Sequence, residues 1–171
     1  MTNAPIDPLA IIELTNLKAA GELEELAWHP ALAAKPEWMN ELASDEDPRV
    51  RLNLAYNPAI TGFPEIVKKL SKDESSYARA NLAQNPAIAN HPDLMERLAT
   101  DKDSSVRASL ACNPTLPVAS TAIEKLSKDQ NVTVRRRLAA NPAIVNLPLV
   151  SKPLLPTRTP LSAGISSNTQ R

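Results

Sequence analysis

A period of 28 residues runs through most of this 171-residue chain and constrains its fold more than any other feature. Four consecutive segments, which begin at Leu42, Leu70, Leu98 and Leu126, align with one another without a gap. The same positions of each segment hold Leu, Asp, Arg, a second Leu followed by Ala, and an Asn-Pro pair. Self-similarity of this kind indicates a repeat architecture, in which each unit packs mainly against its neighbours.

The period extends beyond these four segments, because His29-Pro30 lies 28 residues before Asn57-Pro58 and so belongs to a divergent first unit. Proline also recurs at the start of successive units, and Pro153 interrupts the sixth one. The recurring polar positions are Asp45, Asp73, Asp101 and Asp129; Arg51, Arg79, Arg107 and Arg135; and Asn57, Asn85, Asn113 and Asn141. The sequence therefore predicts a repeat domain over residues 1–150, with about five units at 8–35, 36–63, 64–91, 92–119 and 120–147.

Each unit is predicted to form two short helices. In unit 64–91 the first helix begins at Pro64, because proline is favoured at the first helical position, and it carries an apolar stripe that includes Ile66 and Leu70. The second helix follows an Asp-rich loop and ends at the Asn-Pro pair. Candidate N-caps of the second helices are Asp47, Ser75 or Ser76, and Asp103 or Ser104. Helices this short are unstable alone, so stacking must stabilise them.

The pattern Val-Arg-x-x-Leu-Ala-x-Asn-Pro, after an Asp-rich turn and before a proline, resembles the leucine-rich repeat variant family over about residues 8–150. The resemblance implies an all-α fold: a right-handed α-solenoid of HEAT or armadillo type, built from about five two-helix units with α-helices and short α- or 3-10 helices. Units of the family are shorter, and the added residues here, such as 59–63, form either a loop or a further helix. The iron–sulfur module of the family's first described members is not implied, because Cys112 is the only cysteine.

Composition argues against several classes of function. Cys112 cannot form an internal disulfide, and His29 and His91 complete no set of zinc or iron–sulfur ligands. No apolar run reaches the roughly 20 residues that span a bilayer, and the first residues lack the features of a signal peptide. We therefore expect a cytoplasmic protein without a membrane partner, metal or cofactor.

The sequence also shows no catalytic constellation. It contains no glycine-rich phosphate loop, no nucleophile paired with a histidine, and no periodic pair of carboxylates outside the predicted capping loops. We therefore predict that the chain is not an enzyme. The alternative is a helical-repeat enzyme of the base-excision glycosylase kind, in which dispersed residues, among them a catalytic Asp, form the site.

The recurring Arg and Asn positions are interpreted mainly as structural. The Arg stem can pack beside the core while its guanidinium reaches a loop Asp or carbonyls of the adjacent unit; the alternative is a column that binds a ligand. Stacked helices are about 8–10 Å apart, whereas phosphates of one strand are about 3.4 Å apart, so the column does not match a nucleic-acid backbone. The Asn side chains, and His29 in the first unit, are expected to bond backbone groups of the turn.

Binding is sought instead at the variable positions of the second helices. These candidates are Arg49, Tyr77, Ser105 and Thr133; Asn53, Asn81, Ser109 and Arg137; and Tyr56, Gln84 and Cys112. Mixed polar chemistry favours an adaptable protein-binding face, and the alternative is a solvated face without function. No redox role is expected for Cys112, because nothing nearby in the sequence lowers its pKa. By the same helix phase, Leu82→Ala should cost about 2–5 kcal/mol, while Asn81→Ala should be nearly neutral.

Charge is distributed unevenly along the chain. Residues 1–32 carry five acidic side chains and one Lys, whereas residues 120–171 carry two acidic and eight basic side chains. Residues 151–171, rich in Pro, Ser and Thr and without an acidic residue, are predicted to be a disordered or extended tail. The candidate anion-binding cluster consists of Lys125, Lys128, Arg135, Arg136 and Arg137.

The function predicted from the sequence is a non-catalytic protein-interaction or scaffold module with a variable helical surface. The alternative is a binder of nucleic acid or another polyanion through the basic C-terminal end, although no aromatic platform for bases lies near it. Head-to-tail self-association is a third interpretation, because an acidic end facing a basic end is a heterologous contact.

Overall fold

The computed structural model describes residues 7–117 and 120–145, and all regular structure in them is helical. The 3-10 helices are η1 (Pro30–Ala34), η2 (Pro58–Gly62) and η3 (Pro86–Asn90). The α-helices are α1 (Pro8–Ala20), α2 (Leu23–Trp28), α3 (Pro36–Leu42), α4 (Pro48–Tyr56), α5 (Pro64–Leu70), α6 (Ser76–Gln84), α7 (Pro92–Ala99), α8 (Ser104–Ala111), α9 (Thr121–Ser127), α10 (Val132–Ala139) and α11 (Pro142–Val145). Within these ranges, no helix is both long and apolar enough to cross a membrane.

The helices follow one another in the order that the period predicts. A helix begins at Pro36, Pro64 and Pro92, and the next helix of each segment ends just before an Asn-Pro pair or one residue earlier. The segment after Asn-Pro, which the sequence left open, is a 3-10 helix at Pro58–Gly62 and again at Pro86–Asn90. The expected two-helix unit is therefore wrong in this detail, because units 36–63 and 64–91 contain two α-helices and one 3-10 helix.

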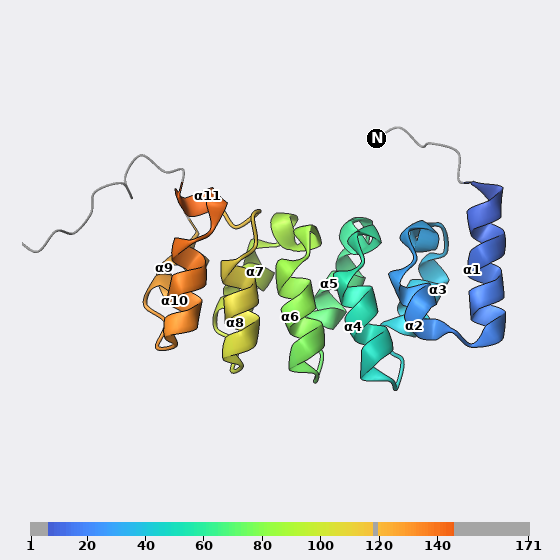
Figure 1. The fold of residues 1–171 in the computed structure, drawn as a ribbon, viewed down its shortest axis with the longest axis horizontal. Coiled ribbons are helices and arrows are strands. Elements are labelled where there is room, and N and C mark those ends of the chain that lie inside the picture. Colours follow the sequence, from blue (N-terminus) through green and yellow to red (C-terminus); the bar gives the residue numbers. More distant parts are fainter. Residues whose placement is uncertain (1–6, 118–119, 146–171) are drawn as a thin grey trace, which may run out of the picture.

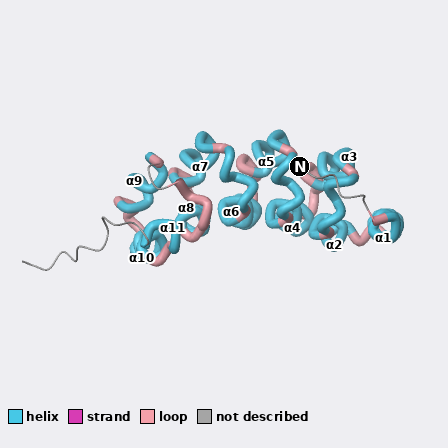
Figure 2. Tube along the Cα trace, turned by 90° about the horizontal axis from the view of Figure 1, so that it is seen from above, coloured by secondary structure: helices cyan, strands magenta, loops and turns pink. Residues whose placement is uncertain are grey.

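The helices form two rows, which Figure 1 shows from the side and Figure 2 from above. One row consists of α2, α4, α6, α8 and α10, each in contact with the next, and we call it the second-helix row. The other consists of α3, α5, α7 and α9, where contacts between neighbouring helices are sparser. The second-helix row lies on the inner side of a gentle arc (Figure 2).

Local chemistry explains where the second helices begin. The side chain of Asp47 accepts a hydrogen bond of 2.8 Å from the N–H of Arg49, and Asp103 and Asn131 cap α8 and α10 in the same way. Ser75 stands at the capping position of α6, but its side chain makes no capping bond. The predicted caps are thus confirmed at Asp47 and Asp103 and wrong for Ser75.

The first helix differs from its counterparts because it continues to Ala20. It ends in a Schellman motif, in which the Gly21 and Glu22 N–H groups donate to the carbonyls of Lys18 and Leu17. Gly21 has φ of 74°, a left-handed conformation that glycine adopts without a steric cost. This turn directs the chain into α2, which begins the second-helix row.

The core is aliphatic and continuous from α1 to α11. Leu54, Leu82 and Leu110 are completely buried at equivalent positions of α4, α6 and α8, and Ile60 and Ile88 are completely buried in η2 and η3. Each unit therefore completes the core of its neighbour, as the stacking argument predicts. The predicted tail, residues 151–171, and the end of the predicted fifth unit lie outside the described residues.

Candidate functional site

The recurring Asn side chains connect adjacent units. Asn85 is 3% exposed; its Nδ2 donates to the carbonyls of Ala55 (2.9 Å) and Asn57 (3.0 Å), and its Oδ1 accepts from the N–H of Ala87 (2.9 Å). The other three positions have the same set of hydrogen bonds: Asn57, Asn113 and Asn141. The amide thus joins its own turn to the preceding unit, which the sequence analysis did not foresee.

His29 occupies the corresponding position of the first unit and makes half of these contacts. Its Nδ1 accepts from the N–H of Ala31 at 3.2 Å, as the Asn oxygen does. Its Nε2 lies 3.3 Å from the carboxylate of Glu13 on α1. The expected role of His29 in the turn is therefore confirmed, and α1 supplies its second contact because no unit precedes it.

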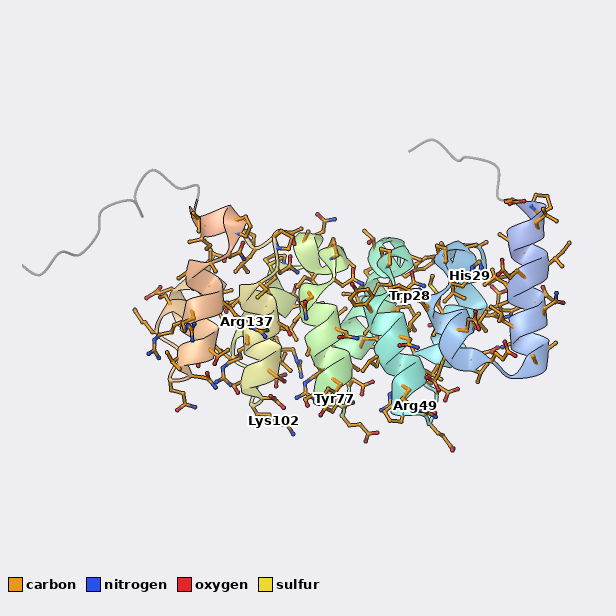
Figure 3. The ribbon with its side chains drawn as sticks, in the orientation of Figure 1. Trp28, His29, Arg49, Tyr77, Lys102 and Arg137 are labelled. Atoms are coloured by element: carbon orange, nitrogen blue, oxygen red, sulfur yellow. The ribbon has the colours of Figure 1, made fainter. Side chains whose placement is uncertain are left out.

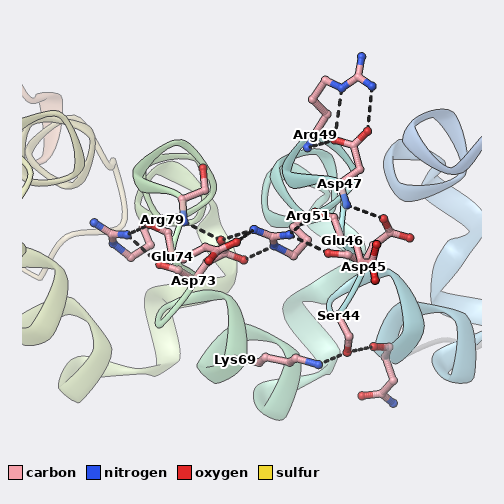
Figure 4. Close-up of polar contacts among 12 residues, drawn as sticks. Ser44, Asp45, Glu46, Asp47, Arg49, Arg51, Lys69, Asp73, Glu74 and Arg79 are labelled. Carbon is pink, nitrogen blue, oxygen red and sulfur yellow. Dashed lines mark hydrogen bonds and ion pairs between the residues drawn. The ribbon is translucent and has the colours of Figure 1, made fainter.

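The recurring Arg side chains form a second ladder, shown around Arg51 in Figure 4. Its Nη1 donates to the carbonyls of Asp45 (2.7 Å) and Glu46 (3.1 Å) in its own unit. Its Nε and Nη2 donate to the carboxylate of Asp73 in the next unit, at 2.8 and 3.2 Å. Arg79 pairs with Asp101 and Arg107 with Asp129 in the same way. The carbonyls belong to the arginine's own unit, so the expectation that they belong to the adjacent unit is wrong.

These pairs shift the pKa values of their members. Hydrogen bonds from Arg107 lower the pKa of Asp129 despite its burial. Burial acts to raise the pKa of Asp101, but the hydrogen bonds from Arg79 and from the N–H of Asp103 outweigh it, so this pKa is also lowered. The same bonds raise the pKa of Arg107 and Arg79. Because Arg51, Arg79 and Arg107 are between 5 and 8% exposed, this column is not accessible to an external ligand.

Three of the variable candidates contribute to packing rather than to a free surface. Asn53 and Asn81 donate through Nδ2 to the carbonyls of Glu24 (3.1 Å) and Leu52 (3.2 Å) in the preceding units. Ser109 is 5% exposed and its Oγ accepts from Nε2 of Gln84 at 3.1 Å. Ser109 is therefore wrong as an exposed contact residue, and Asn81 is not free as expected. A polar side chain on a second helix can face the neighbouring unit, and composition does not reveal which ones do.

The structure brings seven of the eleven surface candidates together in one shallow hollow of about 470 Å³ between α6, α8 and α10. They are Tyr77, Asn81, Gln84, Ser105, Ser109, Thr133 and Arg137. Tyr77 at its rim is 72% exposed. Figure 3 shows Tyr77 and Arg137 on the second-helix row. Arg49, Asn53, Tyr56 and Cys112 do not line this hollow.

An exposed aromatic pair lies toward the N-terminal end of the same row. The rings of Trp28 on α2 and Tyr56 on α4 stack with centroids 4.9 Å apart and planes 28° apart, and each residue is 49% exposed. Trp28 was not among the predicted candidates, although it lies 28 residues before Tyr56 in the column that continues to Gln84 and Cys112. Extending the variable columns into the first unit would have found it.

The other isolated candidates have ordinary surroundings. Arg49 is exposed and forms ion pairs with Asp47 (2.8 Å) and Glu24 (3.2 Å). Cys112 is exposed. Among the described residues, no three His, Cys, Asp or Glu side chains gather closely enough to hold a metal ion.

The five basic candidates do not form one cluster. Lys125 pairs with Glu96 at 3.0 Å and Lys128 with Glu124 at 2.6 Å. Arg135 donates through Nη1 to the carbonyls of Asp129 and Gln130, at 2.6 and 3.1 Å. Arg136 and Arg137 are exposed and form no ion pair within the described part of the chain. The expectation of a single five-residue anion site is therefore wrong, because two of its members already have carboxylate partners.

Comparisons with known proteins identify no relative. No family model, no curated protein and no solved structure matches this chain. The similarity to the leucine-rich repeat variant family thus stays a prediction from the repeated motif, and function must be inferred from the geometry.

Proposed function

We propose that this chain is an α-solenoid of about five 28-residue units, of leucine-rich repeat variant type, and that it acts as a non-catalytic protein-interaction module. The partner binds along the inner, second-helix row. Solenoids present extended concave surfaces of this kind, and their curvature follows from a small rotation between units. The cytoplasmic location predicted from the sequence is kept as part of the proposal.

The observation that carries the proposal is the set of exposed aromatic side chains on this row. Trp28 and Tyr56 stack on each other at the start of the row, and Tyr77 stands at the rim of the hollow between α6, α8 and α10. Large side chains in contact with one another are rarely left half exposed on a solvated face. Trp and Tyr are enriched among residues that dominate the energy of protein interfaces, so these three are the expected anchors.

The recurring polar residues support the proposal by their unavailability. The Arg and Asn columns are buried and bonded between units, so they hold the scaffold together. What varies from unit to unit lies instead on the second-helix row, where a change alters the surface without breaking the stack. This separation of scaffold and surface positions is the expected organisation of an interaction module, and it leaves no conspicuous nucleophile or acid–base pair.

The test is an affinity capture from native lysate with the full chain as bait. The baits are the wild type, the double variant Trp28→Ala/Tyr56→Ala, and Lys68→Ala as the control. Lys68 is exposed on α5, which belongs to the opposite row. Bound proteins are identified by mass spectrometry, and thermal melting of each bait verifies that it is folded.

Proteins captured by the wild type and by Lys68→Ala, but lost with the double variant, are the expected result. Equal capture by all three folded baits would refute the assignment of the aromatic pair as the anchor. Each lysate is also divided into nuclease-treated and untreated halves. Partners that disappear after nuclease would favour the alternative of nucleic-acid binding through Arg136 and Arg137, which are the basic candidates without an ion pair in the described residues.

A further inference from the structure

The Arg–Asp ladder is open at its C-terminal end. Arg135 repeats half of the geometry of the buried ladder arginines, because its Nη1 donates to two carbonyls of its own loop, those of Asp129 and Gln130. Arg51, Arg79 and Arg107 use Nε and Nη2 for a carboxylate of the next unit. In Arg135 these two donors have no partner within the described residues, and the residue is exposed.

The chain does not contain a side chain that could complete this pair. In each closed pair the Asp lies 22 residues after the Arg, and the residue 22 positions after Arg135 is Thr157. Residues 146–171 contain neither Asp nor Glu. A carboxylate on Nε and Nη2 of Arg135 must therefore come from another source.

The two backbone contacts preorganise this guanidinium. With Nη1 held by two carbonyls, the plane of the group is set and the edge formed by Nε and Nη2 faces away from the array. Parallel N–H bonds from this edge to a carboxylate combine charge with geometric selectivity. In the three closed pairs the distances from this edge to the Asp oxygens lie between 2.6 and 3.2 Å.

The neighbouring position strengthens the preference for an acidic partner. Ala80 and Ala108 lie 28 residues apart on α6 and α8 and are 9% and 4% exposed, because the next helix of the row packs against them. The next residue in this column is Arg136, which is exposed. The end of the row thus presents two adjacent guanidinium groups where the interior units present alanine and a neutralised arginine.

We propose that Arg135 is a docking site for an Asp or Glu carboxylate on an exposed acidic turn of a partner protein. The three closed pairs indicate the conformation of this ligand. Asp73, Asp101 and Asp129 each accept from the Arg while one oxygen also accepts from the N–H two residues later, at 2.8 to 2.9 Å. The preferred ligand is therefore an Asp at the start of a tight turn, followed by a free backbone N–H.

Two other occupants fit less well. In a second copy stacked head to tail, the position equivalent to the ladder Asp is Leu17, inside the continuous helix α1, so no carboxylate has the required place. A nucleic-acid backbone needs a row of free cations, and Lys125 and Lys128 are already paired with Glu96 and Glu124. Both occupants are nevertheless outcomes of the test below.

The site lies on α10, apart from the aromatic pair on α2 and α4, so its test is separate from that of the proposed function. The probe is a capped peptide of residues 70–77 (LSKDESSY), which contains the turn that occupies this edge of Arg51. Its control is the same peptide with Asp73→Asn. Binding to the full chain is followed by the NMR signal of the Arg135 Nε–H group at millimolar peptide concentration.

The protein variants are Arg135→Gln and the matched Arg136→Gln, which removes the same charge one residue away. For these variants, affinity is measured from backbone amide shifts of α10. We expect Arg135→Gln and the Asp73→Asn peptide each to lower the affinity by about tenfold or more. Arg136→Gln should lower it by only about twofold, since it removes charge attraction alone.

Several results would overturn the proposal. These are no shift of the Arg135 signal with the wild-type peptide, equal losses for the two variants, or tighter binding of a ten-nucleotide single-stranded DNA than of the peptide. Concentration-dependent self-association in sedimentation velocity that is abolished by Arg135→Gln would place a second copy at the site and would also contradict it. Loss of peptide binding in Trp28→Ala/Tyr56→Ala would show that the peptide binds elsewhere.

Discussion

Asn85 provides the sharpest test of the inter-unit contacts, because Asn85→Ala removes three hydrogen bonds without disturbing an apolar side chain. The carbonyl of Asn57 keeps a second bond, from the N–H of Ile60 at 3.3 Å. The carbonyl of Ala55 and the N–H of Ala87 are left without a partner, and both residues are at most 1% exposed. A buried group left unsatisfied costs about 1–3 kcal/mol, so we expect a loss of about 2–5 kcal/mol in the free energy of unfolding.

The matched control is Asn81→Ala, four residues earlier on the same helix. Asn81 is half-buried and donates a single bond, to the carbonyl of Leu52. Its removal should cost about 0.5–1.5 kcal/mol. This value replaces the nearly neutral effect expected from sequence, where the residue was assigned to a free surface.

Both variants are measured by urea unfolding, monitored by far-UV circular dichroism and by tryptophan fluorescence. Trp28 and Trp38 lie in the first two units, so fluorescence reports that end while circular dichroism reports all helices. Coincident transitions are needed for a two-state free energy, because long repeat arrays can lose cooperativity. A loss for Asn85→Ala no larger than that for Asn81→Ala would refute the reasoning from buried, unsatisfied backbone groups.

The remaining predictions concern the core, the Arg ladder and its response to acid. Leu82→Ala should cost about 2–5 kcal/mol in the same assay, since Leu82 is completely buried; a loss below about 1 kcal/mol would contradict the assigned helix face. Arg79→Gln should cost about 3–5 kcal/mol because it leaves Asp101 unpaired, whereas Arg135→Gln should cost about 0.5 kcal/mol; similar losses would disprove the open end of the ladder. The lowered pKa values of Asp101 and Asp129 give stability that is full above their unfolded pKa of about 3.9 and lost as pH falls toward the folded pKa; a melting temperature unchanged between about pH 5 and pH 2.5 would contradict this.

The helix boundaries could be predicted because their signals are local. Proline at the first helical position, an Asp or Asn cap and a terminal Asn-Pro pair act within a few residues, and the structure follows them at Pro64, Asp47 and Asn85. The segment after Asn-Pro could not be assigned, since five residues such as 58–62 are too few to show a periodicity. The failure at Ser75 has a related cause: its N–H donates to Asp73, which already orders the loop.

The surface was predicted less well because it depends on the rotation of each helix about its axis. Sequence spacing placed Asn81 and Ser109 in the same column and marked that column as variable, but not as turned toward a neighbouring helix. The aromatic pair was half found, at Tyr56, because the divergent first unit was left out of the columns that yielded candidates. Its stacking with Trp28 depends on the 4.9 Å approach of two helices, which no property of either residue reveals.

The four ladder arginines show how position in the array, rather than the motif itself, decides what a residue does. Arg51, Arg79, Arg107 and Arg135 have the same local sequence setting and the same two bonds to their own loop. The following unit buries the first three and neutralises them, and the fourth keeps two free donors among the described residues. A structural residue of the interior thus becomes a binding residue at the end of the row, since every repeat requires a neighbour that the last one lacks.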